Sequence, residues 1–173
     1  MRKCCREMID QANLVDLNLS YVDFYNAHLN QAALLFSDLR YSNLRAANLN
    51  ETDMYSTNLS YANLSSAYMK NVDLRNSNLK GTNLNRSFLI AVDMRNTENL
   101  LPEQLITDDP PLLCNVALPT HIMSSGISPY RDCDQLPQVM QSRTINTTLE
   151  EAQRIVNEAR QKQWGEPTDT PTE

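Results

Sequence analysis

The sequence predicts an all-β solenoid of parallel strands with four sides to each coil, followed by an α-helical appendage. Three observations predict it. An apolar residue recurs every five residues from Leu14 to Met94, and several outward residue types recur every 20 residues. In addition, all eight prolines lie at or after Pro102, so the composition changes near residue 100. The chain therefore consists of a repeat and a different C-terminal region.

The five-residue period defines the repeating unit. Of its 17 apolar positions 13 are Leu, which predicts a leucine-rich core. The residue before each apolar position is Asn or Asp, with four departures: His28, Ala33, Tyr68 and Phe88. A period of five fits neither the 3.6 of an α-helix nor the 2.0 of a strand, so each unit is a short extended piece followed by a corner. Strand alternation directs the apolar residue inward and the Asn or Asp outward.

A second, longer period predicts how many sides make one coil. Tyr21, Tyr41 and Tyr61 recur at 20 residues. The carboxylates of Asp53, Asp73 and Asp93 recur at the same interval. Four five-residue sides per coil place each series in one column. We expect the three tyrosines to form an aromatic stack near a corner, followed by Gly81.

The units resemble the A(D/N)LXX motif of the pentapeptide-repeat family. They include ANLNE at 47–51, TNLSY at 57–61, ANLSS at 62–66 and VDLRN at 72–76. The resemblance implies a right-handed, four-sided parallel β-helix of about four coils over residues 12–100. It also implies similarity to uncharacterised cyanobacterial members, most of which have no assigned activity.

An N-terminal helical cap is expected over residues 1–11. Cys4, Cys5, Met8 and Ile9 have helical spacing there and would cover the first coil. A cap is required because the open edge of a solenoid would otherwise pair with other chains.

The C-terminal region is predicted from its turn residues and helix signals. Asp134 and the pair Thr148 and Glu151 lie where helices would begin, the latter two as a capping box. The region divides into an irregular Pro-rich segment at 101–133, a two-helix appendage at 134–164 and a disordered tail at 165–173.

Composition argues against catalysis. The three glycines cannot form a phosphate-binding loop, and the two histidines leave little material for a catalytic triad or a zinc site. We therefore expect no enzyme, no catalytic residue, no cofactor and no metal. The aspartate column could hold a cation, but Arg75 and Arg95 on the same wall favour a solvated charge ladder.

Two cysteines could form a disulfide in the irregular segment. Cys114 and Cys133 would staple a loop there, and the alternative is a pair of inert thiols in a reducing cytosol. As the sequence stands, the protein is expected to be cytoplasmic. If the two cysteines are bridged and a leader is missing, a periplasm or a thylakoid lumen is expected instead.

The leading functional hypothesis is a non-enzymatic protein–protein interaction scaffold, monomeric and with an unknown protein partner. The candidate partner-binding residues are Tyr21, Tyr41, Tyr61 and Phe36, whose rings would form an exposed patch. The C-terminal helices could equally cover that patch. No membrane partner is expected, since no window approaches 18 apolar residues. No nucleic acid is expected either, because the net charge is −6 and there is no basic stripe.

Two alternatives belong to other functional classes. Family members that confer quinolone resistance mimic B-DNA and bind DNA gyrase, so the resemblance allows a gyrase inhibitor or protector. Residues 12–100, however, hold seven Lys or Arg and eight Asp or Glu, a net charge of −1, whereas a DNA mimic needs dense negative charge. An uncharacterised enzyme is the weaker alternative, because no residues in the C-terminal region have catalytic spacing.

Overall fold

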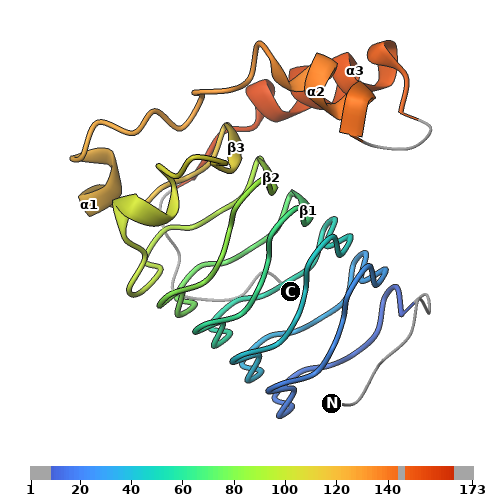
Figure 1. The fold of residues 1–173 in the computed structure, drawn as a ribbon, viewed down its shortest axis with the longest axis vertical. Coiled ribbons are helices and arrows are strands. Elements are labelled where there is room, and N and C mark those ends of the chain that lie inside the picture. Colours follow the sequence, from blue (N-terminus) through green and yellow to red (C-terminus); the bar gives the residue numbers. More distant parts are fainter. Residues whose placement is uncertain (1–8, 144–146, 166–173) are drawn as a thin grey trace.

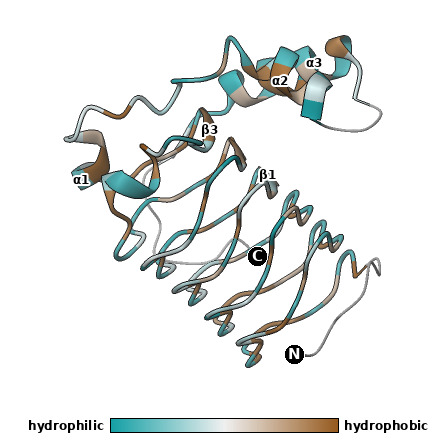
Figure 2. Cartoon of the chain, viewed as in Figure 1, coloured by the Kyte–Doolittle hydropathy of each residue, from teal (hydrophilic) through white to brown (hydrophobic). Residues whose placement is uncertain are grey.

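The computed structural model describes residues 9–143 and 147–165. The chain winds into a right-handed β-helix solenoid whose coils stack along one axis, and a pair of helices lies along one side of it, near the last coils (Figure 1). Hydrophobic and hydrophilic residues alternate along each coil (Figure 2). Each coil therefore supplies apolar side chains to a shared interior.

Parallel pairing between successive coils defines the architecture. Bridges join residues 20 apart, in four ladders that begin with Asn13–Ala33, Asn18–Asp38, Asp23–Asn43 and His28–Asn48. Three segments extend to short strands, namely β1 (Tyr68–Lys70), β2 (Phe88–Ile90) and β3 (Leu112–Cys114), which pair in that order. The 20-residue period of the sequence is thus the pairing distance between coils.

The core is a set of stacked side chains, one from each side of each coil. Leu29, Leu49 and Met69 follow one another in one column and are fully buried. Small residues such as Ala47 and Thr52 fill the space beside them, and the Thr52 hydroxyl donates to the carbonyl of Leu29 at 2.9 Å. Burial of one leucine contributes roughly 1.5–3 kcal/mol, so the ladder supplies most of the stability.

Every corner of the solenoid contains a residue with positive φ. The series recurs every five residues from Gln11 to Asn96, and Gly81 is its single glycine. The corner N–H donates to a carbonyl of the next coil, as Asn26 does to Arg45 at 3.0 Å. A left-handed conformation costs roughly 1–2 kcal/mol in a non-glycine residue, so pairing between coils must hold each corner in place.

The solenoid continues beyond residue 100, where the sequence predicted its end. Phe88 pairs with Leu112 and Asp93 with Ala117, an offset of 24 instead of 20. The extra residues include the 3₁₀ turn η1 (Pro102–Gln104). The expectation of about four coils ending at residue 100 was therefore too short, because a four-residue insertion hides the last layer from a search at a period of five.

The outer edge of β3 is closed by Asp132. Its N–H donates to the Leu113 carbonyl at 3.0 Å, and its carboxylate accepts from the Leu113 N–H at 2.8 Å. The short helix α1 (Thr120–Met123) contributes the buried Ile122 to the interior of the solenoid. This end of the sheet thus offers few free backbone groups for pairing with another chain.

Two antiparallel helices form a hairpin beside the last coils. They are α2 (Leu136–Arg143) and α3 (Leu149–Gln161), near the predicted positions. The Thr148 hydroxyl caps α3 by accepting from the Glu151 N–H at 3.1 Å. The Glu151 carboxylate pairs with Arg154 at 2.6 Å, so it does not complete the predicted capping box.

The N-terminal end differs from the helical cap expected over residues 1–11. Ile9 and Gln11 donate to His28 and Asn30 of the next coil, at 3.0 and 2.8 Å, so residues 9–11 already belong to the solenoid. The rest of the expected cap and residues 166–173 of the expected tail lie outside the described residues. Among the described residues, no helix is long and apolar enough to cross a bilayer.

Candidate functional site

The three recurring tyrosines occupy the same corner of three successive coils and so form one corner column. Tyr21, Tyr41 and Tyr61 have φ of 61°, 58° and 61°, and each lies 20 residues from the next. The N–H groups of Tyr21 and Tyr41 donate to carbonyls of the next coil at 3.0 and 3.1 Å. The backbone therefore fixes where each ring leaves the corner.

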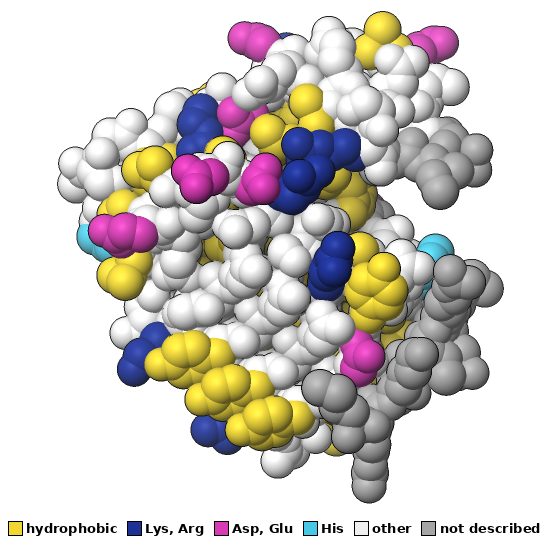
Figure 3. Space-filling model, in the orientation of Figure 1, with side chains coloured by type: hydrophobic (Ala, Val, Ile, Leu, Met, Phe, Trp, Pro, Cys, Tyr) yellow, Lys and Arg dark blue, Asp and Glu magenta, His cyan; other side chains and the backbone are white. Residues whose placement is uncertain are grey.

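The rings form the predicted stack. The centroids of Tyr21 and Tyr41 are 5.0 Å apart, those of Tyr41 and Tyr61 are 5.2 Å apart, and both pairs are within 9° of parallel. The residues are 65%, 47% and 46% exposed. Exposed hydrophobic side chains form a row along the solenoid in Figure 3. We call Tyr21, Tyr41 and Tyr61 the tyrosine stack.

Gly81 lies at the next corner of the same column and closes the stack. A Cβ atom on Gly81 would lie 2.7 Å from a carbon of the Tyr61 ring. Any side chain there would clash with that ring in its present position. The absence of a side chain at Gly81 therefore allows the Tyr61 ring to lie flat over the Gly81 corner. The stack therefore has a defined end.

Phe36 does not join the tyrosine stack. It lies at the preceding corner and meets Tyr55 edge to face, with the centroids 5.9 Å apart. Tyr55 is only 6% exposed, because Arg75 covers its ring at 5.6 Å and Asn76 donates to its hydroxyl at 2.7 Å. The four predicted partner-binding residues thus occupy two corner columns. Phe36 remains 52% exposed.

Two members of the aspartate column, Asp73 and Asp93, form a ladder of ion pairs with arginines. Arg75 contacts Asp73 at 2.7 Å and Asp93 at 3.7 Å, while Arg95 contacts Asp93 at 2.7 Å. These pairs raise the pKa of both guanidinium groups, chiefly through the side-chain hydrogen bonds. Within residues 9–143 and 147–165, no three His, Cys, Asp or Glu side chains group as metal ligands would.

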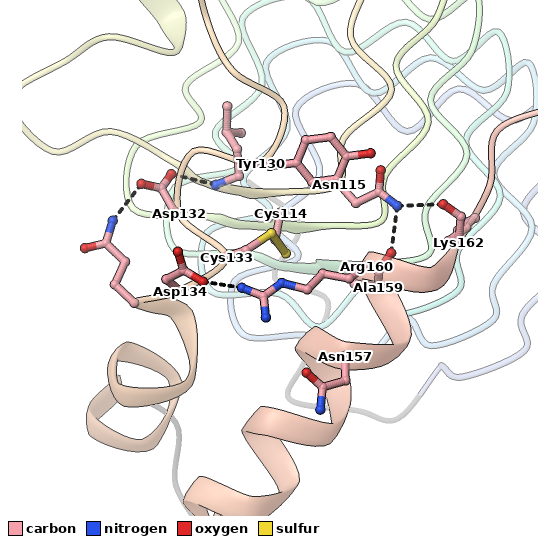
Figure 4. The surroundings of a disulfide bond; sticks show 12 residues. Cys114, Asn115, Tyr130, Asp132, Cys133, Asp134, Asn157, Ala159, Arg160 and Lys162 are labelled. Carbon is pink, nitrogen blue, oxygen red and sulfur yellow. Dashed lines mark hydrogen bonds and ion pairs between the residues drawn. A yellow bond between two sulfur atoms is a disulfide. The ribbon is translucent and has the colours of Figure 1, made fainter.

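Cys114 and Cys133 form a disulfide, with their Cα atoms 4.8 Å apart. Cys114 ends β3, and Cys133 lies just before α2, so the bond ties the last strand to the helical hairpin (Figure 4). Both cysteines are buried in a hydrophobic cluster between the last coils and the hairpin, together with Leu136 and Ala159. The bond is therefore shielded from solvent.

Asn115 fastens the end of α3 to the solenoid, beside the disulfide (Figure 4). Its amide donates to the carbonyls of Ala159 and Lys162 at 2.6 and 2.8 Å, and its oxygen accepts from the Trp164 indole at 3.0 Å. Lys162 lies 4.5 Å from the Trp164 ring and donates to the Ala91 carbonyl. Burial lowers the pKa of Lys162, and Asp93 and Asp73 oppose this effect.

The hairpin docks where the repeat departs from its own pattern. Tyr68 and Phe88 occupy outward positions that normally hold Asn or Asp, and both pack into the cluster formed with α2 and α3. These departures were visible in the sequence and are the signal of the docking surface. The side of the solenoid that begins with Asp23 and Asn43 separates the tyrosine stack from the side where the hairpin docks. The hairpin therefore leaves the stack uncovered, which removes the alternative that the helices cover it.

Comparison with known proteins identifies the repeat. The profile described as "Pentapeptide repeats" matches in eight copies, over residues 18–54, 37–76 and 57–96. No match exists among curated protein sequences.

Comparison with solved structures gives several matches. A pentapeptide repeat protein from the thylakoid lumen of Arabidopsis thaliana is 23% identical, with a TM-score of 0.55, over 83% of this chain and 88% of that one. Rfr23 from the cyanobacterium Cyanothece 51142 is 21% identical over 62% and 88%, with a TM-score of 0.32. The plasmid-mediated fluoroquinolone resistance protein QnrB1 is 14% identical over 73% and 94%, with a TM-score of 0.32.

Of these three structures, the Arabidopsis protein alone exceeds a TM-score of 0.5, and at its identity it indicates a shared fold. Together with the leucine ladder, the profile match leads to one conclusion: residues 18–96 of the chain are a repeat region of the pentapeptide-repeat family.

Proposed function

We propose that the protein is a non-enzymatic scaffold that binds another protein through the tyrosine stack. The observation that carries the proposal is the exposure of three parallel rings on a rigid corner, left free by the hairpin. Tyrosine is enriched at protein interfaces because it combines a large apolar ring with a hydroxyl. Pentapeptide-repeat proteins are also generally structural or interaction proteins.

The accessible chemistry of the tyrosine stack suits a protein surface. Both ring faces of Tyr41 are covered by its neighbours, and one face of Tyr61 lies over Gly81. Ring edges and hydroxyls therefore form most of the accessible surface. Nucleobases need open ring faces for stacking, so the stack is poorly suited to single-stranded nucleic acid.

Charge disfavours the gyrase-mimic alternative. Residues 12–100 carry a net charge of −1, and Arg75 and Arg95 balance the charges of Asp73 and Asp93. A DNA mimic would need an excess of negative charge along this wall.

The buried disulfide supports an oxidising place of action. Structural disulfides persist in secreted, periplasmic or lumenal proteins and are rare in a reducing cytosol. We infer that the protein works in such a compartment. Thiol alkylation of the protein drawn from its native cells should find Cys114 and Cys133 protected, and free thiols at both would contradict this.

Binding is tested by comparing three forms of the protein. Tyr41→Ala with Tyr61→Ala removes two rings of the stack, and Tyr130→Ala removes an exposed tyrosine elsewhere. Quantitative affinity purification from native cells should find a protein that is retained by the wild type and by Tyr130→Ala, and depleted about tenfold or more with the double variant.

Equal retention by the double variant would remove the tyrosine stack from the interface. A parallel supercoiling assay separates the alternative, because inhibition of DNA gyrase at low micromolar protein would favour the mimic over the scaffold.

A further inference from the structure

A cleft of about 650 Å³ lies between the helical hairpin and the solenoid, away from the tyrosine stack. Its solenoid side consists of one corner column and the adjoining wall, and its other side comes from α2, α3 and Thr147. The lining includes Ala46, Tyr68, Arg86, Met140, Arg143 and Ile155. The volume is within the range of roughly 300–1,000 Å³ that is typical of small-molecule sites.

The sequence explains why the cleft is open. The corner column reads Asn26, Ala46, Ser66 and Arg86, so small side chains lie where the tyrosine column carries rings. The hairpin is anchored further along the solenoid, on Phe88 and the strands after it. It therefore overhangs Ala46, Ala47 and Ser66, whose small side chains leave the space open.

The floor and roof of the cleft are apolar. Tyr68 and Phe88 line it from the solenoid, and Met140 and Ile155 line it from the hairpin. Burial raises the pKa of Tyr68 to about 12, with smaller contributions from Glu151 and Glu158. The phenol therefore stays neutral at physiological pH and remains able to donate a hydrogen bond.

Two cations give the cleft a positive character in a chain whose net charge is −6. Arg86 and Arg143 both line it. Arg86 is 3.5 Å from Asp109 in a solvent-exposed pair, which is weak, so a second anion can compete for its guanidinium. The one acidic lining residue, Glu151, is already paired with Arg154 at 2.6 Å.

We propose that this cleft binds a small amphipathic anion: an apolar chain lies between Tyr68 and Met140, and a carboxylate faces Arg86 and Arg143. Apolar walls with a few charged groups are the usual composition of a ligand site. Arginine binds carboxylates through paired N–H donors, so it sets the orientation of such a ligand. This site is independent of the tyrosine stack.

The experiment uses decanoate as the probe and decanol as its uncharged counterpart. Isotope-labelled methionine methyl groups report the position, because Met140 lines the cleft and Met94 is buried in the solenoid core. Decanoate should shift the Met140 signal saturably and leave the Met94 signal in place. Decanol should bind about tenfold or more weakly.

Two sets of variants assign the interaction. Arg86→Asn with Arg143→Gln should weaken decanoate about tenfold or more and leave decanol unchanged. Asn suits the corner of Arg86 because it occupies the same corner at Asn26. Ala46→Tyr should block both probes by filling the cleft, and Asn96→Tyr, at a corner of similar φ outside the lining, is its matched control.

Several outcomes would overturn the proposal. They are the absence of a saturable Met140 shift, equal binding of decanol and decanoate, and equal losses in Ala46→Tyr and Asn96→Tyr. Thermal unfolding of each variant checks that it is folded. Tyrosine is already accepted at left-handed corners, since Tyr21, Tyr41 and Tyr61 occupy three of them.

Discussion

The solenoid and the helical hairpin are stabilised in different ways. In the solenoid, the same contacts recur in every coil, as in the buried series Leu39, Leu59 and Leu79. The hairpin is held by contacts that occur once, above all the Cys114–Cys133 bond and the amide of Asn115. A mutation in the repeat therefore weakens contacts with the neighbouring coils, whereas a mutation at the hairpin weakens a single attachment.

The two regions should therefore respond differently to mutation. Loss of an inward leucine leaves a cavity between two adjacent coils and should lower the stability of the whole stack. Loss of a hairpin attachment should release α2 and α3 while the coils before them stay paired. Three measurements test this contrast, in order of decreasing effect.

The largest effect is expected in the repeat. Leu64 is fully buried, so Leu64→Ala should lower the free energy of unfolding by about 2–5 kcal/mol through a cavity. The neighbouring outward change Ser65→Ala should alter it by less than about 0.5 kcal/mol. Denaturant unfolding measures both, and similar losses at the two positions would contradict the inward and outward assignment.

The disulfide should be the strongest attachment of the hairpin. Cys114 and Cys133 are 19 residues apart, and a loop of that size predicts about 3 kcal/mol of stabilisation. In Cys114→Ala with Cys133→Ala, hydrogen exchange should accelerate in α2 and α3 and stay slow in the coils around Leu49. A uniform acceleration over both regions would show that they unfold as one unit.

The smallest of the three effects is expected at Asn115. Asn115→Gly keeps the left-handed backbone (φ 51°) accessible and removes the amide, so the end of α3 should lose about 1–3 kcal/mol. Hydrogen exchange in α3 and Trp164 fluorescence report the loss. The control Asn96→Gly should change stability by less than about 1 kcal/mol, and an equal effect of both would attribute the loss to glycine itself.

The repeating part of the fold could be predicted from the sequence because one physical rule applies to every unit. Leu29, Leu49 and Met69 follow the five-residue phase and are buried, and the 20-residue recurrence correctly predicted the tyrosine stack. Tyr55 occupies an outward position of the five-residue phase but is buried by Arg75 and Asn76. Burial of an outward residue depends on its neighbours in other coils. The five-residue period predicts only whether a side chain points inward or outward, so it does not predict this burial.

The remaining features depend on contacts made once. The pairing of Phe88 with Leu112 could not be predicted from the period, since an insertion changes the offset to 24. The role of Asn115 follows from its meeting the end of α3, more than 40 residues later in the chain. Phe88 itself was the visible signal, because an aromatic residue in an Asn or Asp position needs a partner to cover it.

Coils pair at a distance of 20 residues from Asn13 to Glu98, so each coil adds one layer of fixed height between the tyrosine stack and the hairpin. Inserting one coil between Tyr61 and Tyr68, with a glycine at its own corner beside Tyr61, would preserve the ladders, the end of the tyrosine stack and the hairpin attachments. It would move the tyrosine stack away from the hairpin by one layer, roughly 4.8 Å. The number of coils therefore sets the distance between the tyrosine stack and the hairpin in steps of one layer. The residues that form the stack and the hairpin attachments stay the same.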